Sequence, residues 1–174
     1  MVSWLLKAYV EKDVSAAPSA NALHEDSRAV LVAGSETTAT TLASVLYYLA
    51  KHPDVLKKLQ YSLDEAIGDS DWSYEKINNI KYLDNIINEN LRLRPAVLTG
   101  GYRVTPPDGL QVDEVFIPGD VNVFVPTQLL QTDERYYPEA KNFIPERWEK
   151  DPHEGAPYFP FLYGESIPVP HHGC

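Results

Sequence analysis

The sequence predicts a mainly α-helical fold with a small antiparallel β-sheet, of the α+β class. Up to residue 93, apolar residues recur at the three- and four-residue spacing of amphipathic helices. After Pro95 they fall instead into short runs, separated by turn sequences such as Pro106-Pro107-Asp108-Gly109. With 174 residues, 44% of them hydrophobic, the chain is long enough to bury one core.

Residues 1–20 are predicted to form a short helix and a linker. The apolar side of a helix over residues 4–11 is made by Leu5, Leu6, Tyr9 and Val10. Residues 13–19, which include alanine and proline, indicate a surface loop. We therefore place the start of the main domain at residue 21.

A continuous helix over residues 22–51 is the longest predicted element, and Pro53 should prevent it from running further. Its centre, residues 33–38, is poor in helix formers, and Gly34 alone costs about 1 kcal/mol. We expect a buried apolar stripe along the helix. This stripe consists of Val32, Ala39, Leu42, Ala43, Leu46, Leu49 and Ala50.

The centre of this helix also carries a strip of small side chains, which has two interpretations. The strip consists of Val30, Ala33, Gly34, Thr37 and Thr41. A flat ligand would fit against it, with Glu36 nearby as a source of protons. Close packing of two helices, with Glu36 in a solvated kink, explains the strip equally well. From this stretch alone both interpretations stay open.

Three further helices are predicted before the strands. Pro53 can open the first of them in its initial turn, and Gly68 ends it. A brief helix follows with Ser73 as its cap, and residues 82–93 form the third. On this last helix Glu89 and Arg92 lie three residues apart, a spacing that ordinarily indicates a surface ion pair.

Four short strands should then form one small antiparallel sheet. They cover residues 102–104, 110–112, 115–117 and 121–125. Residues 127–131 indicate one helical turn, and from Asp133 onward the chain is irregular and rich in aromatic residues and proline. A coil of this length is normally functional or packed as a unit of its own.

Charge and composition argue against several kinds of partner. The formal net charge is -10 and the pI about 4.9, so we expect no nucleic-acid or anionic-lipid partner. The first residues lack the pattern of a signal peptide. Glu36 lies near the centre of the best candidate membrane span, so we expect no membrane segment. The single cysteine, Cys174, cannot form an internal disulfide.

Several motifs stand in a fixed order along the chain. They are Ala33-Gly34-Ser35-Glu36-Thr37-Thr38, Glu89-x-x-Arg92, the strand-rich insert, Pro145-Glu146-Arg147-Trp148 and Phe161-x-x-Gly164. Each is common alone, but in this order they resemble the carboxy-terminal half of cytochrome P450, the haem-thiolate monooxygenase family. The match runs over residues 26–164 and looks most like the microsomal type of fungal secondary metabolism. The resemblance therefore implies a partial cytochrome P450 fold, with residues 21–164 as the carboxy-terminal portion of its haem domain.

The resemblance implies roles in catalysis and haem binding for five residues. Glu36 and Thr37 match the acid and the alcohol that deliver protons to dioxygen at the haem. Ala33 and Gly34 match the trough over which the haem and oxygen lie. Arg103 stands where the family places an arginine on a haem propionate.

Other residues are implied in structure and in substrate binding. Arg147 would join Glu89 and Arg92 in a triad that locks the irregular coil onto its helix, with the carboxylate buried between two guanidinium groups. The expected lining of the substrate pocket is Val30, Val97, Leu98 and Thr99. The implied partners are an apolar small molecule and a flavoprotein reductase, for a longer parent protein in the cytoplasm or at the endoplasmic reticulum. We expect no anchor in the chain itself.

The chain departs from the family pattern at both ends. Nothing corresponds to the helices that precede the oxygen-binding helix in the family. After Gly164 the family expects an arginine two residues on and the thiolate cysteine four residues on, where this chain has Ser166 and Pro168. We expect residues 165–174 to be an aberrant, disordered tail produced by a shifted reading frame, a retained intron or a mistaken gene end.

The tail contains the remaining candidate iron ligands. His171, His172 and Cys174 have side chains that bind iron or zinc. We nevertheless predict no metal site, because Cys174 lies six residues beyond the expected position and lacks the following helix that stabilises a thiolate.

Three functional hypotheses follow. The chain is a portion of a haem-dependent monooxygenase, or it is a truncated and inactive chain that holds no thiolate-ligated haem and at most binds another molecule. The third hypothesis is an unrelated α+β domain with a coincidental set of motifs. A carbon-monoxide difference spectrum separates the first two, because thiolate ligation gives a distinct long-wavelength band.

Overall fold

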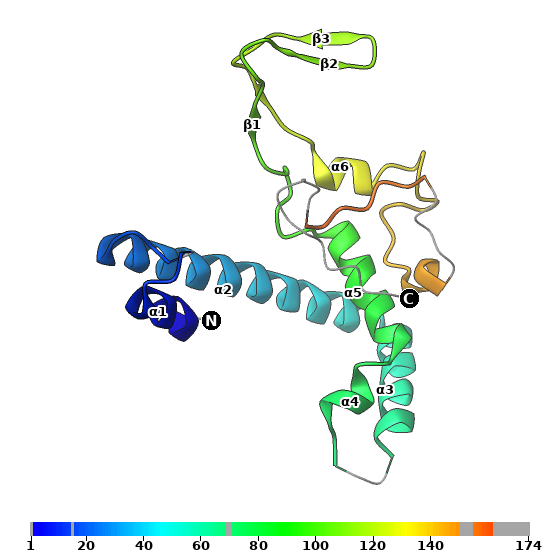
Figure 1. Ribbon diagram of the computed structural model, residues 1–174. Helices are drawn as coiled ribbons and strands as arrows, with labels where there is room; N and C mark the ends of the chain where they lie inside the picture. Colours follow the sequence, from blue (N-terminus) through cyan, green and yellow to red (C-terminus); the bar gives the residue numbers. More distant parts are fainter. Residues whose placement is uncertain (1, 15, 69–70, 150–154, 162–174) are drawn as a thin grey trace. The chain divides into compact units, whose positions relative to one another are not determined.

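The computed structural model describes residues 2–14, 16–68, 71–149 and 155–161 (Figure 1). It divides the chain into two compact units, Met1–Ala43 and Ser44–Cys174. The predicted class, mainly α with a small amount of antiparallel β-structure, is confirmed.

The first unit contains helix α1 (Val2–Glu11) and most of helix α2 (Ala20–Lys51). Lys12 has a φ of 55°, and the backbone N–H of Asp13 donates to the carbonyl of Ala8, so that α1 ends here. Helix α2 begins two residues earlier than predicted because the hydroxyl of Ser19 accepts a hydrogen bond from the N–H of Ala22 at 3.1 Å. This bond satisfies one of the free donors at the start of the helix.

Helix α2 runs without a break through the glycine and threonines at its centre. The hydroxyl of Thr37 donates to the carbonyl of Ala33 at 2.7 Å, and that of Thr41 donates to the carbonyl of Thr37 at 2.8 Å. Both hydroxyls thus bond to carbonyl oxygens of their own helix.

The predicted buried stripe along α2 is wrong within the described part of the chain. Of its members only Leu49 is buried, whereas Val32, Leu42 and Leu46 are 53%, 58% and 66% exposed. The apolar spacing is present, but only the last turns of the helix pack into the core of the second unit.

Helix α2 is also the one helix among the described residues that is long and apolar enough to cross a membrane, judged by length and composition. None of the apolar window is buried. The core helix of a soluble protein meets the same test, so the absence of a membrane segment stays a prediction.

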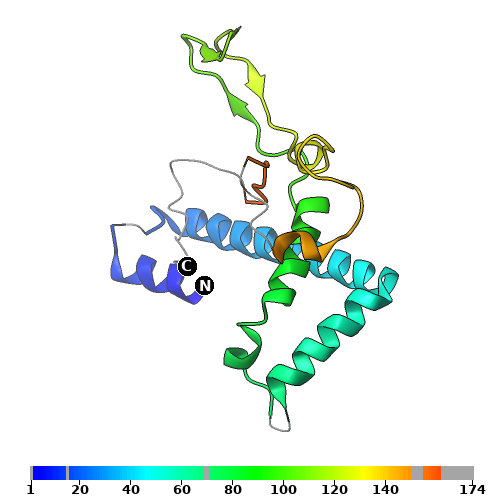
Figure 2. The same cartoon turned by 90° about the vertical axis from the view of Figure 1, so that its right-hand side faces the viewer.

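The core of the second unit lies where three helices and the end of α2 meet. These are α3 (Pro53–Ile67), α4 (Tyr74–Ile77) and α5 (Lys81–Leu93), and Figure 2 shows α3 and α5 from the side. Gly68, with a φ of 61°, ends α3 as predicted. Ser73 occupies the N-cap position of α4, as predicted, but its side chain makes no capping hydrogen bond to any of the described residues. The core residues are Leu49, Val55, Leu59, Ile80, Tyr82, Ile86, Leu93 and Phe143.

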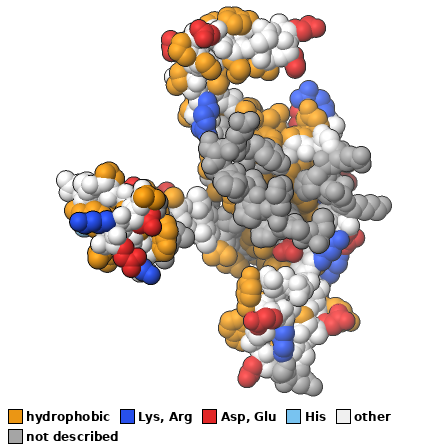
Figure 3. Space-filling model, viewed as in Figure 1, with side chains coloured by type: hydrophobic (Ala, Val, Ile, Leu, Met, Phe, Trp, Pro, Cys, Tyr) orange, Lys and Arg blue, Asp and Glu red, His pale blue; other side chains and the backbone are white. Residues whose placement is uncertain are grey.

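The predicted single sheet is found as two separate two-stranded ribbons. Strands β1 (Arg103–Val104) and β4 (Asn122–Val123) pair antiparallel, as do β2 (Leu110–Val112) and β3 (Val115–Ile117). Many apolar side chains of this region are exposed, and they appear as orange patches over β2 and β3 in Figure 3. Between the ribbons, the hydroxyl of Thr105 donates to the carbonyl of Pro118 at 2.7 Å and accepts from the N–H of Val121 at 3.0 Å.

After the strands come helix α6 (Thr127–Gln131), a coil, and the 3₁₀ helix η1 (Pro145–Glu149). Both helices pack on α5. Within the coil, the ring of Phe143 stacks on that of Tyr48 with centroids 4.5 Å apart. The fold thus wraps an irregular chain around α5, and the candidate site lies at that junction.

Candidate functional site

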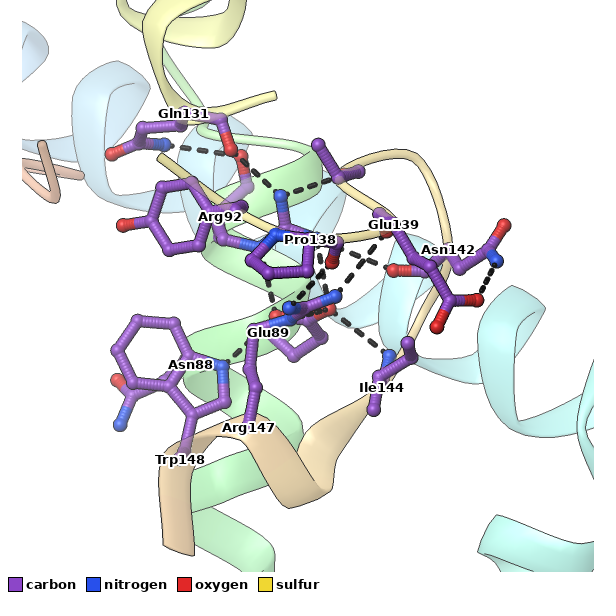
Figure 4. Close-up of polar contacts among 12 residues, drawn as sticks. Asn88, Glu89, Arg92, Gln131, Pro138, Glu139, Asn142, Ile144, Arg147 and Trp148 are labelled. Carbon is purple, nitrogen blue, oxygen red and sulfur yellow. Dashed lines mark hydrogen bonds and ion pairs between the residues drawn. The ribbon is translucent and has the colours of Figure 1, made fainter. Parts of the chain in front are cut away.

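The carboxylate of Glu89 is the centre of a buried polar cluster (Figure 4). Its Oε1 accepts hydrogen bonds from Arg92 Nη2 at 2.8 Å, from Arg147 Nε at 3.0 Å and from the backbone N–H of Ile144 at 3.0 Å. Its Oε2 accepts from Arg92 Nε at 2.8 Å and from the indole Nε1 of Trp148 at 2.9 Å. Five donated hydrogen bonds thus compensate a charge that has lost its contact with water.

The guanidinium of Arg92 has an acceptor for each of its five N–H bonds. Nε and Nη2 hold both oxygens of Glu89 in a bidentate pair. Nη1 donates to the backbone carbonyls of Gln131 and Ala140, both at 2.7 Å, and Nη2 donates to that of Asn142 at 3.3 Å. The residue is fully buried, and this complete pairing compensates its charge for the lost contact with water.

Arg147 ties the coil to the same carboxylate from η1. Its side chain is 10% exposed, and its Nη1 and Nη2 donate to the carbonyls of Pro138 at 3.0 Å and Glu139 at 3.3 Å. The side chains of Glu89, Arg92 and Arg147 therefore meet, as the family resemblance leads us to expect. The alternative interpretation of Glu89 and Arg92 as a surface ion pair is wrong. Helical spacing shows that two residues are neighbours, but it does not show which distant segment covers them.

Two glutamines that the sequence analysis did not single out cap the end of α5. Gln131 Nε2 donates to the carbonyls of Leu91 at 3.2 Å and Arg92 at 3.1 Å. Gln128 Nε2 donates to the carbonyl of Leu93 at 3.2 Å. The last carbonyls of a helix have no partner inside it, so these amides satisfy them. A short turn with two glutamines carries no distinctive sequence signal for this role.

A second polar network fastens η1 to α3 at the surface. Lys58 Nζ donates to Glu146 at 2.8 Å and to Glu149 at 3.3 Å, and the hydroxyl of Tyr82 donates to Glu146 at 2.9 Å. Burial raises the pKa of Glu146, but the bonds from Lys58, the backbone and Tyr82 outweigh it and hold the pKa below the ordinary 4.5. Burial and the hydrogen bond to Glu146 raise the pKa of the Tyr82 hydroxyl.

The residues expected on the oxygen side of a haem all lie on α2 in the first unit. Ala33, Gly34, Glu36 and Thr37 are exposed. Among the described residues no atom comes within 4 Å of a Cβ built on Gly34, so the backbone here is open to a flat group. The Thr37 hydroxyl is paired with the carbonyl of Ala33, one turn earlier.

The residues expected at a propionate and in the substrate pocket fall in both units. Arg103, on β1, is exposed, and its Nη1 donates to the carbonyl of Tyr102 at 2.8 Å. Val97, Leu98 and Thr99 are exposed in the turn between α5 and β1. Val30 is half-buried in the first unit.

The described residues meet one requirement of a haem but not the other. The open backbone at Gly34 suits a flat ring. An axial thiolate is lacking among the described residues, because they include no cysteine. His171, His172 and Cys174, and with them the predicted tail, lie outside the described residues. The residues that the structure describes therefore do not fit a thiolate-ligated haem.

Comparison with known proteins identifies one family. The sequence model of the family described as Cytochrome P450 matches residues 2–165. The chain is 48% identical over 166 residues to Cytochrome P450 monooxygenase eupD of a Phoma species. The matched residues make up 94% of the chain and 58% of that relative. It is 39% identical over 173 residues to Cytochrome P450 monooxygenase sthD of Phaeosphaeria nodorum, covering 97% of the chain and 35% of the relative.

A third relative carries a more specific name. The chain is 40% identical over 146 residues to Tryprostatin B 6-hydroxylase of Aspergillus fumigatus, covering 79% of the chain and 27% of the relative. The chain thus spans between about a quarter and somewhat more than half of the length of these curated relatives.

Proposed function

Because this chain belongs to the cytochrome P450 family, we propose that it is a portion of a haem-dependent monooxygenase. The whole enzyme would insert one oxygen atom from dioxygen into an apolar small molecule, with electrons supplied by a flavoprotein reductase. Residues 21–164 would be its contribution to the haem domain. The names of the fungal relatives support a place in secondary metabolism, and the endoplasmic reticulum is the location we propose for the whole protein.

The observation that carries this proposal is the five-bonded carboxylate of Glu89. Its partners come from α5 and from a coil more than fifty residues later, so it fixes the path of that coil relative to the helix. In a haem-thiolate enzyme this coil leads towards the segment that faces the iron. We propose that Glu89, Arg92 and Arg147 are the structural triad of this enzyme.

The remaining site residues have proposed roles that their positions support to different degrees. Ala33 and Gly34 offer a backbone open to a flat ring, and Glu36 and Thr37 stand beside it for proton delivery. Arg103 is exposed and would need to exchange its bond to Tyr102 for one to a propionate. We propose Val30, Val97, Leu98 and Thr99 as the substrate lining on the family resemblance alone.

We propose further that the 174-residue chain is itself inactive. Pro168 stands where the resemblance expects the axial cysteine, and the described residues contain no cysteine to replace it. An axial thiolate is what favours cleavage of the O–O bond in such haems.

The carbon-monoxide difference spectrum of the reduced, haem-supplemented chain tests this second proposal. We expect no thiolate-type band. A thiolate-type band that disappears on Cys174→Ser would show that Cys174 supplies the ligand and that the chain is competent after all.

Exchange with a relative tests the first proposal. Residues 2–165 of this chain would replace the aligned part of sthD, which keeps its own sequence elsewhere. We expect the chimera to show the thiolate-type band, and Glu89→Ala in the chimera to lose it while Glu65→Ala, at an exposed position on α3, retains it. A soluble, haem-loaded chimera without the band would contradict the proposal. If the large exchange does not fold, exchange of residues 44–149 tests the triad in the same way.

A further inference from the structure

Residues 156–160, in the described stretch after η1, are half-buried, and Tyr158 and Phe159 are bonded to α5 and α6. The hydroxyl of Tyr137 donates to the carbonyl of Pro157 at 3.0 Å. The hydroxyl of Tyr158 donates to Asn88 Oδ1, on α5, at 2.9 Å, and burial raises its pKa. The segment is thus held by polar contacts from the coil and from α5.

The backbone of the same segment is bonded to α6. The N–H of Phe159 donates to Gln131 Oε1 at 2.9 Å. Gln131 is fully buried, and its Nε2 donates to the carbonyls of Leu91 and Arg92 at the end of α5. One side-chain amide therefore connects α6, the end of α5 and the segment before the Phe161-x-x-Gly164 motif.

Gln131 is also part of the buried cation's environment. Its backbone carbonyl accepts from Arg92 Nη1 at 2.7 Å, while its Nε2 donates back to the carbonyl of Arg92 at 3.1 Å. Because two carbonyls face one end of the amide and an N–H faces the other, the opposite amide orientation would set oxygen against oxygen. The surroundings thus require an amide that donates on one side and accepts on the other.

We propose that Gln131 is the positioning residue that joins residues 157–161 to the Glu89 cluster. The three charged residues fix the coil at 138–148. Gln131 accepts a hydrogen bond from Arg92 through its backbone carbonyl and one from the N–H of Phe159 through its side chain, so it links the cluster to the next segment. The role of this connection in haem binding rests on the proposed function, because residues 157–161 lead into the Phe161-x-x-Gly164 motif that precedes the expected haem ligand. The join itself needs no haem.

Hydrogen exchange of the Phe159 amide, followed by NMR on the chain without haem, tests the proposal. Gln131→Met keeps the length of the side chain but removes both its donor and its acceptor. We expect protection of the Phe159 amide to fall about five- to tenfold, the effect of losing one hydrogen bond. Gln131→Glu retains an oxygen acceptor but sets its second oxygen against the carbonyls of Leu91 and Arg92, so we expect protection to fall at least as far as in Gln131→Met.

Gln128→Met is the matched control. It removes the other glutamine that caps α5 without touching the coil, since Gln128 Nε2 donates to the carbonyl of Leu93. We expect it to weaken the end of α5 but to leave the exchange of Phe159 within about threefold of the parent. Loss of protection in both variants at position 131, without loss in this control, separates positioning of the coil from a general loss of stability at the end of α5.

Three results would overturn the proposal. The first is an unprotected Phe159 amide in the unmodified chain, which requires no variant to fold. The second is equal protection in Gln131→Met and the parent. The third is a loss of about tenfold in Tyr137→Phe, which would assign the segment to the Tyr137 hydroxyl instead. Because haem is absent from every sample, these results are independent of the carbon-monoxide spectrum that tests the proposed function.

Discussion

Trp148 and Glu89, which are 59 positions apart, are joined by a hydrogen bond from the indole Nε1 to Oε2 at 2.9 Å. The preceding residue, Arg147, donates its Nε to the other oxygen, Oε1, at 3.0 Å. Two consecutive residues of η1 therefore occupy both oxygens of one buried carboxylate. The neutral indole supplies a donor without adding a third cation beside Arg92 and Arg147.

We expect Trp148→Phe to lower the free energy of unfolding by about 1.5–3 kcal/mol, because it removes a hydrogen bond to a buried charged group. Urea unfolding followed by far-UV circular dichroism measures the change. Trp72→Phe is the control, since Trp72 is 72% exposed. Equal losses in both variants would mean that the indole bond contributes nothing specific.

Arg92→Ala should be more damaging, at about 3–5 kcal/mol, because it leaves the carboxylate of Glu89 buried with its main counter-charge removed. Soluble yield and the urea midpoint are the measurements. Arg94→Ala, two residues further on at an exposed position, should change neither. An unchanged midpoint for Arg92→Ala would return the pair to the status of a surface ion pair.

The network at Glu146 should make stability depend on pH in the acidic range. Its folded-state pKa lies below 4.5, so its contribution is present above pH 4.5 and is lost as the pH falls through the folded-state value. We expect the stability difference between the parent and Glu146→Gln, about 1 kcal/mol or less, to shrink as the pH falls below 4.5. A difference that grows on acidification would contradict this sign.

Two glycines should respond oppositely to alanine. Gly34 lies inside α2, with no described atom within 4 Å of an added Cβ, so Gly34→Ala should stabilise the helix by about 1 kcal/mol. Gly109 has a φ of 81°, and an added Cβ would lie 2.7 Å from the carbonyl oxygen of Ile117, so Gly109→Ala should be destabilising. Thermal unfolding of both variants measures the contrast. Destabilisation by Gly34→Ala would show that α2 needs the glycine for its own packing.

Local signals in the sequence predicted the helices well. Pro53 and Gly68 delimit α3 as expected, because each restricts the backbone whatever lies nearby. The apolar residues of α2 have the helical spacing that the sequence predicts, but most of them are not buried. Burial depends on which other segments pack against the helix, and helical spacing does not show this. For the same reason the strands were identified, whereas their division into two ribbons was not.

The candidate site was predictable only through the order of its motifs. Nothing in the spacing of Glu89 and Arg92 indicates that Arg147 completes their cluster. The sequence did not reveal Trp148 as a donor to Glu89, nor Gln131 as a donor to the carbonyls of Leu91 and Arg92, because indole and amide side chains satisfy buried acceptors at positions that the fold alone decides.

The long sequence separation within the Glu89 cluster has a consequence for synthesis on the ribosome. Glu89 and Arg92 can pair as soon as α5 forms, but the other donors to the carboxylate come 55 to 59 residues later. At about 5–20 residues per second, translation needs roughly 3 to 12 seconds to reach them. During that interval we expect the Glu89–Arg92 pair to lie on a finished helix without the hydrogen bonds that the coil and η1 later supply. A chaperone would meet the second unit in this state, before η1 leaves the exit tunnel and closes over it.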